Sequence, residues 1–189
     1  MYICLLGMSW IPYIHFEEQL RRVQKYLERK QVVGIKLFTG HEAFYLTDER
    51  LETTYETAIR FDVPVLFHSG WENSQYSDVL KVLEIASKYP RLKLVCCHCF
   101  YPQIEKCKML LDYSNVFFDL SSIADDADVW ENMQEQCKEL IELAPTRVLF
   151  GSDYACCSQQ EHIKFMKGVE LDKQLEENLF YKNAQRLYL

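Results

Sequence analysis

Three apolar segments of the sequence end in side chains that can bind a metal ion or move a proton. VLFHSG at 65–70 carries His68, LVCCHC at 94–99 carries His98, and VLFGSDYA at 148–155 carries Asp153. Each could be structural when taken alone, as a hydrogen-bonded core histidine or a helix N-cap aspartate. Because all three occupy the same position in their segments, a joint functional role is favoured.

Two histidines and an aspartate together suit a metal-assisted reaction. Imidazole and carboxylate groups are good ligands for Zn²⁺ and similar divalent ions. Such an ion lowers the pKa of a water molecule toward neutrality. A carboxylate can then take the water's proton, and a second histidine can polarise the substrate or protonate its leaving group. We therefore predict that His68, His98 and Asp153 bind metal, and that His98 and Asp153 are also catalytic.

The elements that must position these residues alternate along the chain. Short β-rich apolar runs are separated by stretches in which apolar residues recur at helical spacing. The runs are 2–7, 32–38, 63–69, 92–98, 115–121 and 147–153, and the main helical stretches are 15–30, 48–62, 76–90, 102–113, 128–145 and 172–189. Strand and helix units at intervals of roughly 30 residues indicate a parallel sheet.

Two parallel architectures suit this pattern: an open doubly wound sheet and a (β/α)8 barrel. The polar strand ends favour the barrel, because its active site lies where the carboxyl ends of the strands converge. No glycine-rich phosphate loop supports the open sheet. We predict one domain over 1–189, an α/β parallel barrel of the TIM type. With about six of eight βα units, it lacks the first two.

Composition and charge narrow the class of protein. The formal net charge is −7 and 49 % of residues are hydrophobic, so a nucleic-acid binder with a basic stripe is not expected. The apolar segment 1–14 is too short to span a bilayer and lacks the features of a signal peptide. The eight cysteines are expected to be reduced thiols of a cytoplasmic protein. CCHC at 96–99 does not have the ligand spacing of a zinc knuckle.

From about residue 32 to the end, the sequence resembles the amidohydrolase superfamily, in its amidohydrolase-related (amidohydrolase 2) branch. The resemblance rests on GIKLF (34–38), VLFHSG, LVCCHC, VLFGSDYA and the C-terminal NLFYKNAQRLYL. It implies a barrel with a divalent metal, expected to be zinc, at the strand ends. It also implies that His68 is a metal ligand, that His98 is a ligand or catalytic histidine, and that Asp153 binds metal and handles the proton.

The sequence departs from the family pattern in one respect. The first strand of that family ends in His-x-His, and no His-x-His occurs in this sequence. The segment 2–7 corresponds by position to the third strand of the barrel. We therefore expect a fragment, a misassigned start, or a part that is completed by a second copy or by an N-terminal chain.

Three functions remain open. The first is a metal-dependent hydrolase acting on an amide, lactone or related bond of a small molecule. The second is a decarboxylase on the same scaffold, and the third is a non-catalytic remnant or assembly partner. Lys36, His41 and Trp71 are the expected substrate-binding residues, and Arg147 could add to a preference for anions. His162 is expected on a helix surface.

Overall fold

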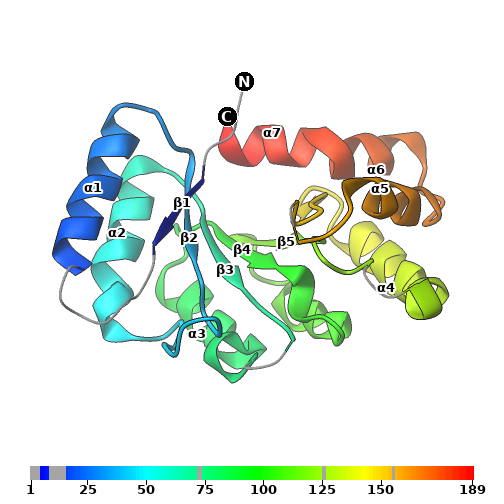
Figure 1. Cartoon of the computed structure of the whole chain (residues 1–189), viewed down its shortest axis with the longest axis horizontal. Coiled ribbons are helices and arrows are strands. Elements are labelled where there is room, and N and C mark those ends of the chain that lie inside the picture. The colour runs from blue at the N-terminus through cyan, green and yellow to red at the C-terminus, as the bar shows by residue number, and fades with distance from the viewer. Residues whose placement is uncertain (1–4, 9–15, 72–73, 125–126, 155) are drawn as a thin grey trace.

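The computed structural model describes residues 5–8, 16–71, 74–124, 127–154 and 156–189. Six parallel strands form one sheet in the order β1-β2-β3-β4-β5-β6 (Figure 1). The strands are β1 (Leu5–Met8), β2 (Gly34–Leu37), β3 (Val65–His68), β4 (Leu94–Cys97), β5 (Val116–Asp119) and β6 (Val148–Leu149). The predicted parallel α/β architecture is confirmed. In the described part of the chain β1 pairs only with β2 and β6 only with β5, so the sheet does not close.

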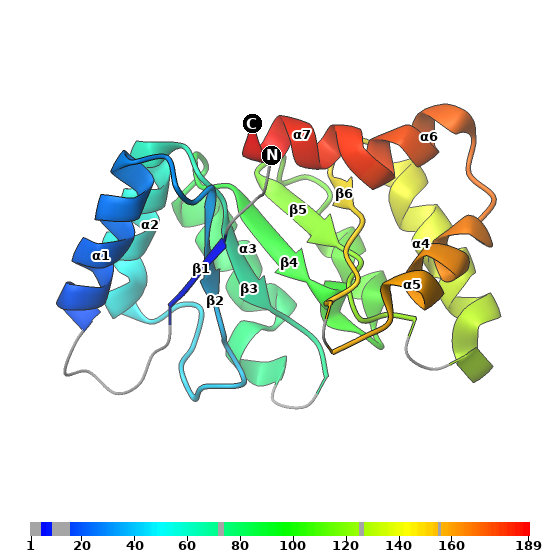
Figure 2. The same ribbon diagram turned by 45° about the horizontal axis from the view of Figure 1, so that its top comes forward.

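Helices follow the strands and run beside them. They are α1 (Phe16–Glu28), α2 (Glu52–Phe61), α3 (Val79–Lys88), α4 (Trp130–Leu143), α5 (Gln159–Lys167), α6 (Lys173–Glu177) and α7 (Asn183–Tyr188). Figure 2 shows α1 and α2 beside the β1–β2 end of the sheet, and α4 to α6 beside the β6 end. Several helices begin at a side chain that accepts backbone hydrogen bonds, such as Asp78 for α3 and Ser158 for α5.

Three helical segments differ from the sequence prediction. The stretch 102–113 contains the 3-10 helix Ile104–Leu110 in place of an α-helix. The C-terminal stretch is interrupted between α6 and α7 by the π-helix Asn178–Lys182. Helix α5 had not been predicted as a separate element. Its nine residues form barely more than two turns, which is too short for a clear helical periodicity.

Both faces of the sheet are buried, as expected for parallel strands. Alternate strand residues enter two separate apolar clusters because successive side chains point to opposite faces. The larger cluster packs against the flanking helices and includes Ile35, Leu37, Val65, Phe67, Leu94 and Phe118. The smaller cluster occupies the other face and contains Leu66, Val95, Cys97, Leu149 and Leu187.

Helix α7 covers this second face. Its Leu187 belongs to the smaller cluster, and Ala184 and Tyr188 pack against it. The buried Asn183 anchors the start of the helix, donating hydrogen bonds from Nδ2 to the carbonyl oxygens of Val148 (2.7 Å) and Pro145 (3.1 Å). Figures 1 and 2 both show α7 running across the strands toward β1. The C-terminal helix therefore shields apolar strand residues that an unclosed sheet would otherwise expose.

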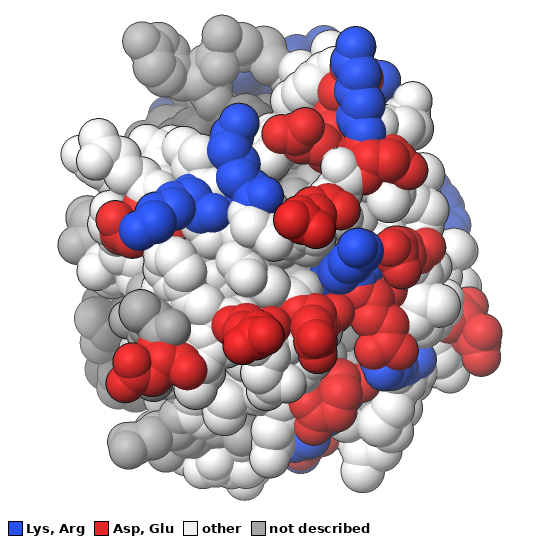
Figure 3. All heavy atoms as spheres, turned by 90° about the vertical axis from the view of Figure 1, so that its right-hand side faces the viewer, with Lys and Arg blue, Asp and Glu red and all other residues white. Residues whose placement is uncertain are grey.

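The outer face near α4, α5 and α6 is rich in acidic side chains. Figure 3 shows Asp and Glu spread over this face, with lysines and arginines between them and no continuous basic stripe. Some of the lysines are paired with acids, as in the Lys164–Glu161 and Lys167–Glu176 contacts at 3.8 and 3.9 Å. Within the described residues, no helix has both the length and the apolar character needed to cross a membrane.

Candidate active site

His68 and His98 come from the carboxyl ends of neighbouring strands. His68 is the last residue of β3, and His98 begins the 3-10 helix His98–Phe100 directly after β4. The strand register pairs His68 with Cys97, one residue before His98. The two rings therefore meet edge to face, with centroids 4.8 Å apart and an angle of 61° between their planes. Both residues are buried, with exposed fractions of 8 % and 5 %.

The backbone at the end of β3 is fixed by two hydroxyl groups. Thr39 Oγ1 and Ser77 Oγ donate hydrogen bonds to the carbonyl oxygen of His68, at 2.8 and 2.5 Å. Burial lowers the pKa of His68 from 6.5 to about 3, with further lowering by the nearby His98, His41 and Lys36. His68 is therefore neutral near pH 7, which is the form that can bind a metal ion.

His98 is held in one tautomer by the loop after β5. Its Nδ1 lies 3.1 Å from the carbonyl oxygen of Ser121. The Ser121 hydroxyl oxygen also lies 3.1 Å from Nδ1. Because a carbonyl oxygen can only accept whereas a hydroxyl can do either, we assign the proton to Nδ1 and the lone pair to Nε2. Burial lowers the pKa of His98, Lys36 lowers it further, and Asp119 acts in the opposite direction. His98 therefore presents a free Nε2 lone pair for a metal ion or a proton.

Asp153 reaches the same region from the loop after β6. Its backbone has a φ of 57°, a conformation that is uncommon for a non-glycine residue. Its Oδ2 accepts a hydrogen bond from Ser122 Oγ at 2.9 Å. Ser122 Oγ is also 3.2 Å from Cys157 Sγ. The Asp153 carboxylate is thus tied to the β5 loop, although the residue itself is exposed.

These side chains line one cavity of about 780 Å³ at the carboxyl ends of the strands. All six residues singled out from the sequence line it: Lys36, His41, His68, Trp71, His98 and Asp153. The other lining residues are Phe38, Gly40, Ser122, Cys156 and Cys157. The volume suits a small molecule.

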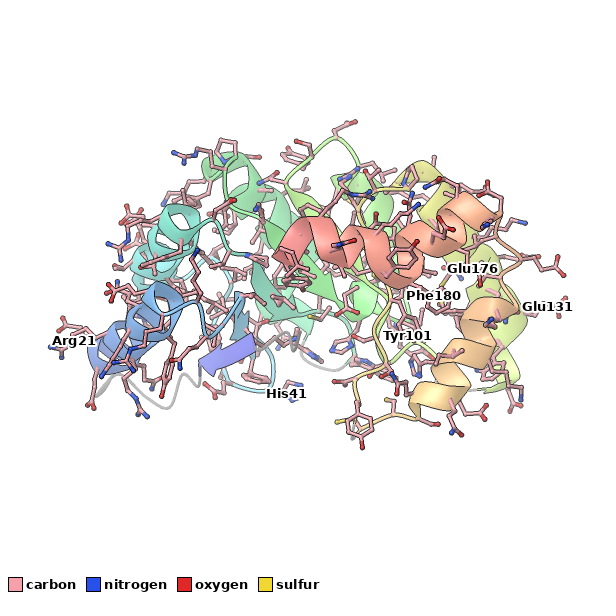
Figure 4. All side chains as sticks on the ribbon, turned by 90° about the horizontal axis from the view of Figure 1, so that it is seen from above. Arg21, His41, Tyr101, Glu131, Glu176 and Phe180 are labelled. Atoms are coloured by element: carbon pink, nitrogen blue, oxygen red, sulfur yellow. The ribbon has the colours of Figure 1, made fainter. Side chains whose placement is uncertain are left out.

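The three predicted substrate-binding residues take different places in the wall. Lys36 is half-buried within β2, with its Nζ 5.9 Å from the centre of the Phe38 ring. The His41 ring is exposed and packs 4.3 Å from the His68 ring. The Trp71 ring lies 4.4 Å from that of Tyr101. In Figure 4, His41 lies beside the β1–β2 end of the sheet, and Tyr101 lies nearer the middle of the molecule.

A family profile matches nearly the whole chain, and several solved structures share its fold. The profile of the amidohydrolase family matches residues 5–189. The chain belongs to the amidohydrolase family. No curated protein sequence matches it closely.

Several solved structures are similar to the chain at low sequence identity. An uncharacterised TIM-barrel protein from Bordetella bronchiseptica has 18 % identity and a TM-score of 0.77, with 98 % of this chain and 66 % of that protein covered. A protein from Lactobacillus casei, described as a metal-dependent hydrolase, has 16 % identity, a TM-score of 0.69 and coverages of 92 % and 60 %. A dihydroxybenzoic acid decarboxylase from a Polaromonas species, with bound manganese and an inhibitor, has 15 % identity, a TM-score of 0.70 and coverages of 91 % and 65 %.

These similarities establish the fold as an incomplete TIM-type barrel. This amidohydrolase chain spans 60–66 % of the length of the three structures. Its six strands form one parallel sheet that stays open between β1 and β6.

The donors in the cavity suit a divalent ion in type but do not converge on one position. Two neutral imidazoles and a carboxylate are common ligands of catalytic metal sites. Among the described residues, however, no three His, Cys, Asp or Glu side chains converge on a single metal position. Catalytic zinc sites ordinarily have three protein ligands. The described donors therefore do not form such a three-ligand site.

Several residues that shape the site were not identified from the sequence, and they lie at the end of β5 or on the loops after β5 and β6. They are Asp119, Ser121, Ser122, Cys156 and Cys157. Asp119 ends β5, and its Oδ1 accepts a hydrogen bond from the Ser121 backbone N–H at 2.9 Å. The strand 115–121 also ends in a carboxylate, so the pattern that identified His68 and Asp153 could have identified Asp119. Nothing in the sequence distinguished Ser122.

Gly151 makes room for the Asp119 carboxylate. A Cβ atom at Gly151 would lie 2.3 Å from Asp119 Oδ1 and 3.0 Å from the Ser121 Cβ. The close approach of the β5 and β6 ends therefore requires a glycine here.

Two other expectations from the sequence were wrong. Arg147 lies outside the cavity, where its guanidinium donates hydrogen bonds to the carbonyl oxygens of Leu111, Tyr113 and Val116. It therefore cannot select anionic substrates in the site. His162 is 1 % exposed, and its Nε2 accepts a hydrogen bond from the Ala124 N–H at 3.4 Å. Helix α5 faces the β5 loop, which buries this histidine.

Proposed function

We propose that this chain is the larger part of a metal-dependent hydrolase that cleaves an amide, lactone or related bond of a small molecule. The observation that carries the proposal is the pair of buried imidazoles with centroids 4.8 Å apart, in one cavity with Asp153. Buried imidazoles with lowered pKa values in a cleft are typical of functional sites. The Lactobacillus casei structure, described as a metal-dependent hydrolase, supports the same reaction class.

We assign roles by position in the cavity. His68 and His98 would hold the ion through ring nitrogens, with Nε2 as the donor atom of His98, and Asp153 would hold it through its carboxylate. A divalent ion supplies activation of water and polarisation of the scissile bond. Asp153 would accept the proton of the attacking water and return it to the leaving atom, while His98, as a ligand, would orient the ion beside the scissile bond. Lys36, His41 and Trp71 would contact the substrate through charge, hydrogen bonding and ring stacking.

The ion is proposed only as divalent, with zinc as one candidate. Manganese is bound in the Polaromonas decarboxylase structure, which supports a divalent ion at this kind of barrel. That structure also supports the second candidate reaction, decarboxylation of a small carboxylic acid. Under this alternative the same cavity would release CO₂ in place of an acid and an amine or alcohol.

The third candidate is a non-catalytic assembly partner. Because the described donors do not complete a metal site, we propose that further ligands come from a second polypeptide segment. That segment would belong either to another copy of this chain or to a complementing chain that pairs with the open sheet edges. We also propose a reducing, cytoplasmic location for the chain.

Calorimetric titration with Mn²⁺ and with Zn²⁺ tests the metal site directly. The 189-residue chain is expected to bind weakly, and His68→Ala is expected to abolish that binding. His162→Gln is the control, since it removes a buried imidazole outside the cavity. Equal affinity of the parent chain and His68→Ala would refute the assignment of His68.

Two further measurements separate the three functions. Assays that follow CO₂ release and acid or amine release in parallel distinguish decarboxylase from hydrolase. The intact mass of the native protein tests completeness. A mass several kilodaltons above 22.5 kDa would indicate an additional segment, and active protein is expected in that case. A mass of 22.5 kDa together with His68→Ala affecting only stability or association would favour the assembly partner.

A further inference from the structure

Ser122 and Asp153 share an unusual backbone conformation and contact each other. Their φ angles are 58° and 57°, and Ser122 Oγ donates to Asp153 Oδ2 at 2.9 Å. Residues with a Cβ atom rarely adopt positive φ, and those that do concentrate at functional sites. Here two such residues, on the loops after β5 and β6, are joined side chain to side chain. The strain lies where these two loops meet at the cavity.

The hydrogen bonds around Ser122 run in one direction. A carboxylate oxygen accepts and cannot donate, so the single hydroxyl proton of Ser122 points to Asp153. The contact between Ser122 Oγ and Cys157 Sγ, at 3.2 Å, must then be donated by the thiol. Hydrogen bonds are therefore donated from Cys157 to Ser122 and from Ser122 to Asp153. Because Ser122 is 5 % exposed, water cannot easily replace it as the donor.

The residue before Ser122 performs a parallel task for His98. The carbonyl oxygen of Ser121 accepts the Nδ1 proton of His98, and the backbone N–H of Ser121 donates to Asp119 Oδ1. Two adjacent serines therefore hold two of the proposed functional groups. The loop after Ser122 is anchored at Ala124. The Ala124 N–H donates a hydrogen bond to His162 Nε2, and the Ala124 carbonyl oxygen accepts one from Trp130 Nε1.

We propose that Ser122 is a positioning residue that holds the Asp153 carboxylate toward the cavity, with Cys157 as the donor that orients the Ser122 hydroxyl. This inference rests on the proposed function, since it gives Asp153 a role toward a metal ion and a water molecule. It goes beyond that function by assigning a task to two residues that do not themselves need to touch substrate.

Ser122→Gly and Ser122→Ala test the proposal because they separate strain from hydrogen bonding. Both remove the hydroxyl group, whereas only glycine adopts positive φ without a steric cost. Ser122→Gly is expected to unfold at the same temperature as the parent chain or at a higher one. Ser122→Ala is expected to unfold at a lower temperature than Ser122→Gly. Both variants are expected to bind Mn²⁺ about 10-fold or more weakly than the parent chain, as for other groups that orient metal ligands.

Alkylation of Cys157 gives a readout that does not depend on metal. Without Ser122 Oγ the thiol loses this hydrogen bond, and iodoacetamide is expected to label Cys157 several-fold faster in both Ser122 variants. Peptide mass spectrometry measures this rate, with the neighbouring Cys156 as internal reference. Cys157→Ser, which keeps a donor, is expected to weaken Mn²⁺ binding less than Cys157→Ala.

The outcomes distinguish failure of this inference from failure of the proposed function. Parent-like Mn²⁺ affinity in a stable Ser122→Gly protein would overturn the positioning role while leaving the metal site intact. Absence of Mn²⁺ binding by the parent chain would instead count against the proposed function. In that case the labelling decides: faster labelling of Cys157 supports the hydrogen-bond chain, and an unchanged rate overturns it.

Discussion

The Nδ1 atom of His98 lies 3.1 Å from the carbonyl oxygen of Ser121, and this contact orients the imidazole of the candidate site. It joins the end of β4 to the loop after β5 and leaves Nε2 as the acceptor. The neighbouring Ser122 binds Asp153 in turn. The site therefore depends on one short loop whose residues were not identified from their sequence.

Acid is expected to destabilise the metal-free chain through His68. Its folded-state pKa of about 3 is below the ordinary histidine pKa of 6.5, so the unfolded chain binds more protons between these two pH values. The contribution of His68 to stability is complete above pH 6.5 and is lost as the pH falls toward 3. At pH 4.5 the loss relative to pH 7 is expected to be about 2 kcal/mol.

Urea denaturation with a chelator present, at pH 7 and pH 4.5, measures this effect. His68→Asn is expected to show a smaller loss between the two pH values than the parent chain. The buried His162 offers the control: His162→Gln is expected to keep most of the loss. An identical loss in the parent chain and in His68→Asn would contradict the prediction.

Gly151→Ala is expected to destabilise the chain by roughly 2–4 kcal/mol, as overpacked or displaced polar groups do. The new Cβ would lie 2.3 Å from Asp119 Oδ1, so the carboxylate must abandon the Ser121 N–H. Gly168→Ala is a matched control, because its Cβ would also lie 2.3 Å from an atom, the amide nitrogen of the flexible Gln134 side chain. Thermal unfolding of both variants measures the difference, and equal losses would argue against a special role for the Asp119 carboxylate.

Arg147→Lys is expected to lower the free energy of unfolding by roughly 2–3 kcal/mol. An ammonium group cannot reproduce the two guanidinium nitrogens that donate to Leu111, Tyr113 and Val116. The exposed Arg91 provides the control, and Arg91→Lys is expected to be neutral. Mn²⁺ affinity is expected to stay at the parent value in Arg147→Lys, because Arg147 does not line the cavity. A loss of affinity without a loss of stability would place Arg147 in the site after all.

Thiol labelling is expected to divide the described cysteines into two classes. Burial raises the pKa of Cys97 to about 12 and raises the pKa values of the other buried cysteines, Cys96, Cys99, Cys107 and Cys137. Because the thiolate is the reactive form, these thiols are expected to resist iodoacetamide in the folded chain. The exposed Cys156 and the half-buried Cys157 are expected to react first. Mass spectrometry before and after unfolding in urea shows the division, and rapid labelling of Cys97 in the folded chain would refute it.

The sequence alone determined the parallel α/β architecture and the end of the sheet at which the site lies. The alternation of β-rich runs with helical stretches predicted all six strands, because burial between two layers of helices demands apolar runs of that length. The polar residues at strand ends identified His68, His98 and Asp153 as neighbours, since parallel strands place their carboxyl ends on one side.

The tertiary structure alone decided which of these groups contact each other. The distance between His68 and His98 depends on the register of β3 and β4, and the contact of Ser122 with Asp153 spans 31 positions between two loops. His162 is buried because α5 packs against the β5 loop, not because of any local pattern. Local periodicity reports the face on which a side chain lies, whereas hydrogen bonds between loops depend on how separate elements pack, and no short stretch of sequence encodes that packing.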